Sequence, residues 1–258
     1  MSLPNFTFAI PLRSAQASVD WARVSAQFQH TASSALSSID ADVRIIVACH
    51  EIPDVEVASD SRVSFVQVDH VTPTSLSLQM FDKSVKKMKL AEEHYRQGGG
   101  YMMLLDSDDL VSNRLASYVL TDDNRSGYFL QHGYILDLRR SSVERVDNFD
   151  AICGSSSIFY LDPADQDTMR FNWPLYITVM RHQDFGPFSE ASPRPMASVP
   201  FPAAIAVKNN GENHSFRENP GLARSIQRRI RKFINRTEIP NSSLPDVAEE
   251  FSCATLLS

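Results

Sequence analysis

Short apolar runs alternate with longer mixed segments over the first 110 residues of the chain. The apolar runs are rich in β-branched and aromatic residues, which is typical of strands buried on both faces. The mixed segments repeat apolar residues near helical spacing. Strands are predicted at Phe6–Leu12, Val43–Cys49, Val63–Val68 and Tyr101–Leu105, and helices at Ala17–Leu36 and Ser84–Gln97. This alternation predicts an α/β protein with a parallel sheet that is covered by helices on both faces.

The pattern becomes less regular after residue 110. Strands are predicted at Gly127–Leu138, Ile158–Leu161 and Ala203–Val207. The small residues of Gly154–Ser157 indicate a loop, and Pro187–Pro202 contains five prolines, which favours an extended segment without regular structure.

Leu222–Arg236 combines an apolar stripe at helical spacing with six Lys or Arg residues and no acid. The pattern fits a basic amphipathic helix on an anionic membrane surface. It fits equally a helix that packs on the protein and exposes its arginines. We therefore divide the chain into a domain of residues 1–220, with halves 1–110 and 111–220, and a basic helix and tail of residues 221–258.

Composition narrows the class of protein. The 258 residues include 25 Lys or Arg against 31 Asp or Glu, and this acidic balance argues against a general nucleic-acid binder. No apolar run approaches the roughly 20 residues of a membrane span, and Met1–Phe8 has no secretory pattern. Cys49, Cys153 and Cys253 lack CxxC spacing, so a disulfide framework is not expected. A cytoplasmic protein is the resulting expectation.

Asp106 and Asp108 stand two residues apart where the Tyr101–Leu105 strand ends. In extended backbone such residues share a side, and two adjacent carboxylates repel each other unless a cation lies between them. Mg²⁺ and Mn²⁺ prefer oxygen ligands, and ligands of parallel sheets bind beyond the carboxyl ends of the strands. The alternative is a surface turn in which Asp109 or Ser112 caps the next helix.

The order strand, helix, strand, strand, lysine-bearing helix, strand, acidic turn resembles that of family 2-type glycosyltransferases with the GT-A fold. The resemblance is carried by Phe6–Pro11, Val43–Cys49, Tyr101–Asp109 and Asn209–Ser215, the last of which looks like the late His loop of such enzymes. It implies a GT-A-type, Rossmann-like mixed sheet flanked by helices. It also implies transfer of a sugar from a nucleotide-diphosphate-sugar donor to a hydroxyl acceptor, either a glycan or a lipid-linked one, with Mn²⁺ or Mg²⁺.

Residue roles follow from the same resemblance. Asp108 and His214 would hold the metal, although a solvated loop histidine is the alternative for His214. An inverting enzyme needs a carboxylate to accept the acceptor's proton, and Asp184 is the best match, with Asp150 as its main rival. The donor would contact Pro11, Glu51, Lys86, Lys89 and Asp106.

The chain also departs from the family pattern. Leu12–Ser14 replaces the usual polar tail of the first strand, and His50-Glu51 stands where acidic residues are usual. The usual Arg-Asn before the acidic turn is absent, and Lys86, Lys87 and Lys89 are the nearby cations.

Two other functions remain open from the sequence. A phosphate hydrolase is disfavoured because the aspartates follow the fourth strand and lack a DxDxT pattern. The other alternative is a non-catalytic, transferase-like module that binds a nucleotide or carbohydrate.

Overall fold

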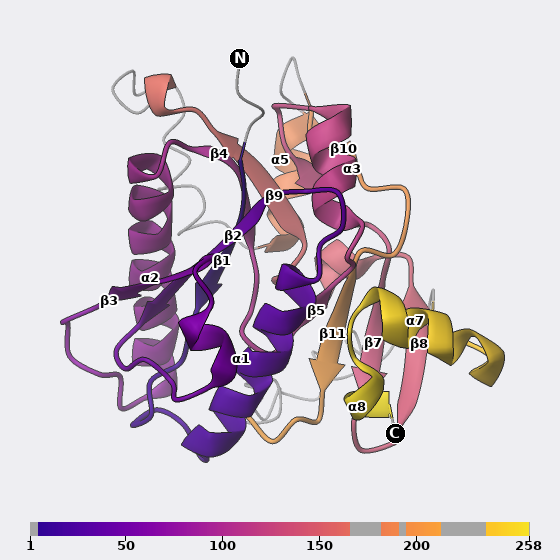
Figure 1. Ribbon diagram of the computed structural model, residues 1–258, viewed down its shortest axis with the longest axis horizontal. Helices are drawn as coiled ribbons and strands as arrows, with labels where there is room; N and C mark the ends of the chain where they lie inside the picture. Colours follow the sequence, from indigo (N-terminus) through magenta and orange to yellow (C-terminus); the bar gives the residue numbers. More distant parts are fainter. Residues whose placement is uncertain (1–4, 166–181, 191–194, 213–235, 258) are drawn as a thin grey trace, which may run out of the picture.

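Two β-sheets flanked by helices make up the protein (Figure 1). The computed structural model describes residues 5–165, 182–190, 195–212 and 236–257. The architecture is mixed α/β, as the sequence predicts, and it is compatible with a Rossmann-like fold.

The larger sheet has the strand order β10-β6-β9-β4-β1-β2-β3. Strands β3, β2, β1 and β4 run parallel, whereas β9 is antiparallel to both β4 and β6. The short β10 runs parallel to β6. The strands are β1 (Phe6–Pro11), β2 (Val43–Cys49), β3 (Val63–Gln67), β4 (Gly100–Leu104), β6 (Tyr128–Phe129), β9 (Ser157–Leu161) and β10 (Ala197–Ser198).

The smaller sheet has the order β12-β8-β7-β11-β5. Its strands β7 and β11 are parallel, and its other pairs are antiparallel. The strands are β5 (Leu110–Val111), β7 (Gly133–Asp137), β8 (Ser142–Val146), β11 (Ala204–Lys208) and β12 (Arg236–Glu238). Because β5 follows the acidic turn directly, that turn connects the two sheets.

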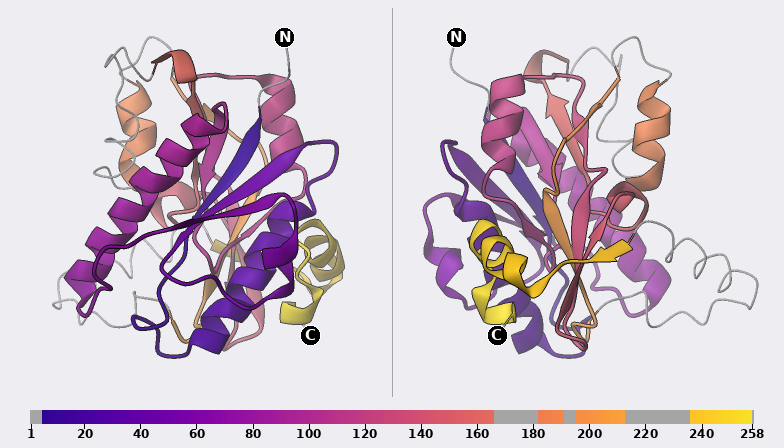
Figure 2. Two further views of the ribbon diagram at one scale, coloured as in Figure 1. Left: turned by 60° about the vertical axis from the view of Figure 1, so that its left-hand side comes forward. Right: turned by 90° about the vertical axis from the view of Figure 1, so that its right-hand side faces the viewer.

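The helices cover both faces of the larger sheet, with α1 and α2 on opposite sides of it (Figure 2). Alternate residues of β1 serve the two faces: Phe8 joins the cluster that includes α1, and Ala9 joins the cluster that includes α2. The α-helices are α1 (Trp21–Leu36), α2 (Leu76–Arg96), α3 (Leu115–Asp122), α5 (Phe185–Glu190), α7 (Leu244–Glu250) and α8 (Ala254–Leu257). The 3₁₀ turns are η1 (Glu56–Ser59), η2 (Phe149–Ala151), η3 (Pro163–Asp165), η4 (His182–Asp184) and η6 (Asn241–Ser243).

The strands predicted for the first 110 residues are confirmed, but the second helix is longer than predicted. Helix α2 begins at Leu76 instead of Ser84, because Ser75 caps it by accepting a hydrogen bond from the Leu78 amide. Leu78, Met80 and Phe81 are exposed in the first turns of this helix. A search for an apolar stripe that faces the core therefore does not detect these turns.

The prediction for the second half needs several corrections. Gly127–Leu138 is not one strand, because it divides into β6 and β7, which belong to different sheets. Pro187 lies within α5 and not in an extended loop; it occupies the first turn, where a helix tolerates proline. Helix α3 was foreseen only as the helix that follows the acidic turn in the alternative of a surface turn. The other elements that were not predicted are β5, β8, β10, β12, α7 and α8.

The basic segment falls largely outside the described residues, which omit 213–235. The division after residue 220 falls in the same gap. Arg236 is described, and it begins β12, where its guanidinium pairs with Glu144 of β8. In the part of the chain that the structure describes, no helix has both the length and the apolar character needed to cross a membrane.

His94 fixes α2 against the sheet from within the core. Its Nε2 donates to the carbonyl of Gly100 at 3.2 Å, and its Nδ1 lies 3.0 Å from the Thr7 hydroxyl. Burial favours the neutral imidazole, in which Nδ1 accepts from that hydroxyl, and lowers the pKa of His94 from 6.5 to about 4.

His94 is therefore expected to make folding pH-dependent. The unfolded chain takes up a proton near pH 6.5 and the folded chain only near pH 4, so stability falls as the pH drops through this window. A shift of this size corresponds to roughly 3 kcal/mol. Urea unfolding at pH 5 and pH 7 should show about 2 kcal/mol of this loss. His94→Gln should make the free energy of unfolding depend less on pH. An equal reduction in the variant of the surface residue His132, His132→Gln, would contradict the assignment.

Candidate functional site

The acidic turn brings three carboxylates together beyond the carboxyl end of β4. The Asp109 amide donates to the carbonyl of Asp106 at 3.1 Å and closes the turn. One ligand oxygen from each of Asp106, Asp108 and Asp109 lies within 4.8 Å of the others. The group could therefore hold a metal ion, and its all-oxygen donor set suits Mg²⁺ or Mn²⁺.

Asp109 has a structural role within this group. Its carboxylate accepts bonds from the Cys153 thiol at 2.9 Å, the Ser155 hydroxyl at 2.7 Å and the Val207 amide at 3.2 Å. Burial and then the charge of Asp108 raise the pKa of Asp109 to about 7. Asp109 thus ties the turn to β11 and to the small-residue loop, and Asp106 and Asp108 are the more exposed members of the group.

Asp106 is held by contacts on both its backbone and its side chain. Its amide donates to the Ser155 hydroxyl at 2.9 Å, and its Oδ1 lies 2.6 Å from the ammonium of Lys83. Burial alone would raise the pKa of Asp106, but the charge of Lys83 lowers it overall. A Cβ at Gly154 would stand 3.1 Å from Asp106 Oδ2, a tight contact that the carboxylate would have to relieve by moving a few tenths of an ångström.

Asp108 is linked to the late loop of the sequence. Its Oδ2 accepts a hydrogen bond from the Asn210 side chain at 2.7 Å. Burial and the neighbouring charge of Asp106 raise the pKa of Asp108, so its ionised form is destabilised. A cation between Asp106 and Asp108 would relieve this repulsion.

The acidic turn opens into a cleft of about 490 Å³. This volume lies in the range of small-molecule sites, which is roughly 300–1,000 Å³. Burial would lower the pKa of both Lys83 and Lys208, but the nearby carboxylates raise both pKa values above the ordinary value. Among the described residues, the lining carries four carboxylates, which are the three of the turn and Asp82, and four cations. The cations are Arg13, Lys83, Lys86 and Lys208, and the His182 imidazole and the Cys153 thiol also line the cleft.

Only some of the residues predicted to contact the donor lie in this cleft. Pro11 and Lys86 line it together with Asp106. The Lys86 ammonium is buried and donates to Asp82 and to the Leu12 carbonyl, both at 2.8 Å. It therefore links α2 to the residue that follows β1. Glu51 accepts from the Ala15 amide at 3.2 Å, and Lys89 pairs with Glu92 on the exposed side of α2.

Asp150 and Asp184 come from neighbouring 3₁₀ turns, η2 and η4. The His182 imidazole bonds the backbone carbonyl of Asp150, which joins the two turns, and His182 also lines the cleft. Burial raises the pKa of Asp150 above its ordinary value. Neither candidate base is among the residues that line the cleft, although both are near His182, Asp184 in the sequence and Asp150 through this bond. His214, the other predicted metal ligand, lies outside the described residues.

Lys83 and Lys208 are among the charged groups of the cleft that the sequence did not single out. Lys83 stands three residues before Lys86 on the same helix, at a spacing that places both on one side. It was overlooked because the predicted helix began one residue too late to include it. Lys208 ends β11, whose pairing with β7 and β5 brings it to the acidic turn.

No family model matches the chain, and no curated protein sequence matches it at a significant level. The function of the protein is therefore inferred from the geometry of the cleft.

Proposed function

We propose that the protein is a metal-dependent, inverting glycosyltransferase of the GT-A type that uses a nucleotide-diphosphate sugar. The observation that carries the proposal is the convergence of Asp106 and Asp108 with Lys83 in one cleft. The mixed sheet, with its acidic turn after the fourth strand, supports the GT-A assignment. The hydrogen bond from Asn210 to Asp108 supports the role that the resemblance implies for the loop of Asn209–Ser215, which is to contribute to the metal site.

Asp106 and Asp108 would hold Mn²⁺ or Mg²⁺ through their carboxylates. When bound, such an ion neutralises the charge that develops on a departing diphosphate. The residues fit the ion, because they supply hard oxygen donors and because the pKa of Asp108 indicates electrostatic repulsion in the group.

Lys83 would contribute to binding of the diphosphate. Its ammonium now pairs with Asp106, and its side chain is 34% exposed, so it can turn toward an anion in the cleft. Lys208 lines the same cleft and adds a second cation for the phosphate oxygens. Asp184, or its rival Asp150, would accept the proton of the acceptor hydroxyl.

The acceptor is proposed to be a glycan or a lipid-linked hydroxyl. A lipid-linked acceptor would give a purpose to the basic stretch of residues 222–236, which carries six Lys or Arg residues. Peripheral contact of that stretch with an anionic membrane is part of the same proposal, although residues 222–235 are not among those described.

The proposal predicts binding of a nucleoside diphosphate that depends on a divalent ion. A thermal-shift screen of nucleoside diphosphates should raise the melting temperature in the presence of Mn²⁺, because a ligand that binds only the folded state stabilises it. The shift should vanish when EDTA removes the ion. Sugar release from the matching donor then separates an enzyme from a binding module. A screen in which no nucleotide shifts the melting temperature would contradict the proposal.

A further inference from the structure

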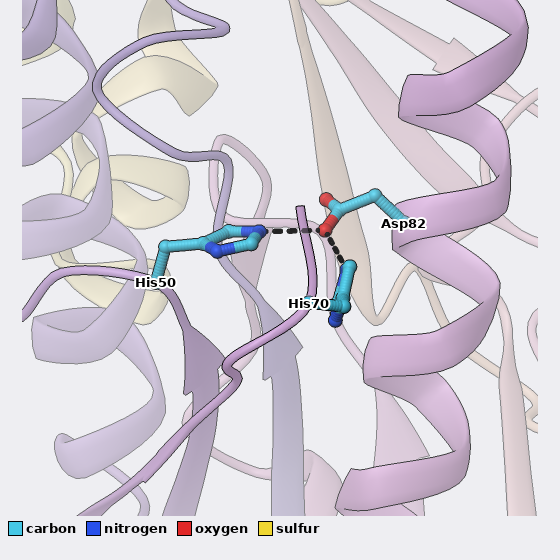
Figure 3. A group of neighbouring side chains, drawn as sticks. All are labelled: His50, His70 and Asp82. Atoms are coloured by element: carbon cyan, nitrogen blue, oxygen red, sulfur yellow. Dashed lines mark hydrogen bonds and ion pairs between the residues drawn. The ribbon is translucent and has the colours of Figure 1, made fainter. Parts of the chain in front are cut away.

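A second group of side chains that could hold a metal ion lies near the carboxyl ends of β2 and β3. His50 directly follows β2, His70 follows β3, and Asp82 stands on α2. Figure 3 shows both imidazole rings pointing at one oxygen of the Asp82 carboxylate. Because β2 and β3 are adjacent parallel strands, residues that follow their carboxyl ends meet at the same edge of the sheet.

The distances place three donor atoms around one point. His50 Nε2 lies 2.9 Å from Asp82 Oδ1, and His70 Nε2 lies 2.8 Å from the same oxygen. In tetrahedral zinc sites with bonds of about 2.0–2.1 Å, two ligand atoms stand roughly 3.3 Å apart. Opening each contact by about half an ångström would therefore admit an ion of this size.

We propose that His50, His70 and Asp82 form a binding site for Zn²⁺ that is separate from the acidic turn. Imidazole nitrogens with one carboxylate suit Zn²⁺, whereas the all-oxygen set of Asp106 and Asp108 suits Mg²⁺ or Mn²⁺. Binding requires each Nε2 to be unprotonated, so the ring proton moves to Nδ1. Three protein ligands leave a fourth position for water.

The surroundings of Asp82 fix its carboxylate for this role. Lys86 Nζ donates to Asp82 Oδ2 at 2.8 Å, which is the oxygen that does not face the imidazoles. Lys86 is itself held by the Leu12 carbonyl and is only 1% exposed. A residue that hydrogen-bonds a metal ligand orients that ligand and increases the affinity for the metal.

The site would clamp α2 to the ends of two strands. Asp82 immediately precedes Lys83, whose ammonium pairs with Asp106. An ion on Asp82 would therefore fix the helical turn that places Lys83 in the cleft. This inference concerns different ligands from those of the proposed transferase site, so either can fail without the other.

The test is calorimetric titration of Zn²⁺ into the full-length, tag-free protein after removal of metals with a chelator. The Asp108→Asn background and excess Mg²⁺ suppress binding at the acidic turn. We expect one equivalent of Zn²⁺ to bind. His70→Gln should weaken Zn²⁺ binding by more than roughly 10–100-fold, which is the loss typical when a residue that hydrogen-bonds a metal ligand is replaced. Glutamine can still donate to Asp82, so the melting temperature of the metal-free variant should stay close to that of its parent.

His132 provides a matched control. It pairs with Asp147 at 2.8 Å and its side chain is 26% exposed, against 2.8 Å from Asp82 and 27% for His70. His132→Gln should leave Zn²⁺ affinity unchanged. Absence of binding in the background variant would overturn the proposal. Unchanged affinity in both His70→Gln and His50→Gln, or an equal loss in His132→Gln, would overturn it as well.

Discussion

Replacing Asp108 by asparagine is expected to abolish the Mn²⁺-dependent part of nucleoside-diphosphate binding. Replacing a residue that only hydrogen-bonds a metal ligand lowers metal affinity by roughly 10–100-fold. Replacing a carboxylate that binds the ion directly should lower it by more. Asparagine has nearly the same shape, and its carbonyl can still accept the bond from Asn210. The variant should therefore fold, and its loss of affinity for the Mn²⁺-bound nucleotide should result from the missing charge alone.

The metal-free Asp108→Asn variant should be at least as stable as the parent at neutral pH. The folded pKa of Asp108 is raised, so its ionised form costs stability once the pH exceeds the unfolded value. Removing the carboxylate removes that cost. Loss of binding together with an unchanged or higher melting temperature would distinguish a lost ligand from a damaged fold.

Asp137 offers the matched control for this experiment. Its Oδ1 accepts a bond from Asn209 at 2.6 Å, just as Asp108 accepts one from Asn210, but Asp137 ends β7 and does not line the cleft. Asp137→Asn should leave nucleotide affinity in Mn²⁺ unchanged. Calorimetry that shows full Mn²⁺-dependent affinity in Asp108→Asn, or the same loss in both variants, would exclude Asp108 as a ligand.

The sequence predicts the part of the site that is local along the chain. A buried apolar run followed at once by acidic residues places Asp106 and Asp108 at a strand end, and both lie there in the structure. The prediction for the acidic turn needs only strand periodicity and the rule that ligands bind beyond carboxyl ends. Pro11, which the resemblance to glycosyltransferases implies, lines the same cleft, because it ends a neighbouring parallel strand.

The remainder of the site depends on contacts between distant segments. Asn210 meets Asp108 across 102 positions of sequence, and Ser155 meets Asp109 across 46. No periodicity encodes these contacts, since they arise from strand pairing in the two sheets. The group of His50, His70 and Asp82 was missed for the same reason, although two histidines that follow adjacent strands are a usable signal.

The proposed transferase needs a catalytic base, and two substitutions separate the candidates Asp184 and Asp150. Asp184→Asn is expected to lower kcat by about 100-fold or more, the range that general-base catalysis supplies. The KM for the donor should change little, because a general base would contact the acceptor hydroxyl and not the diphosphate. Asp150→Asn, on the neighbouring turn, is the matched control and should retain most of its activity.

The pH dependence of kcat/KM provides a second criterion that does not rely on the variants alone. A general base works only when ionised, so activity falls as the pH drops below its pKa. Burial raises the pKa of Asp150, and its use as the base would move the acidic limb above the ordinary range of a carboxyl group. If Asp150→Asn is inactive, Asp184→Asn turns over normally and the parent enzyme shows this elevated limb, the base is Asp150. If only Asp184→Asn loses kcat, and the acidic limb of the parent's pH profile is absent from that variant, the proton transfer is assigned to Asp184.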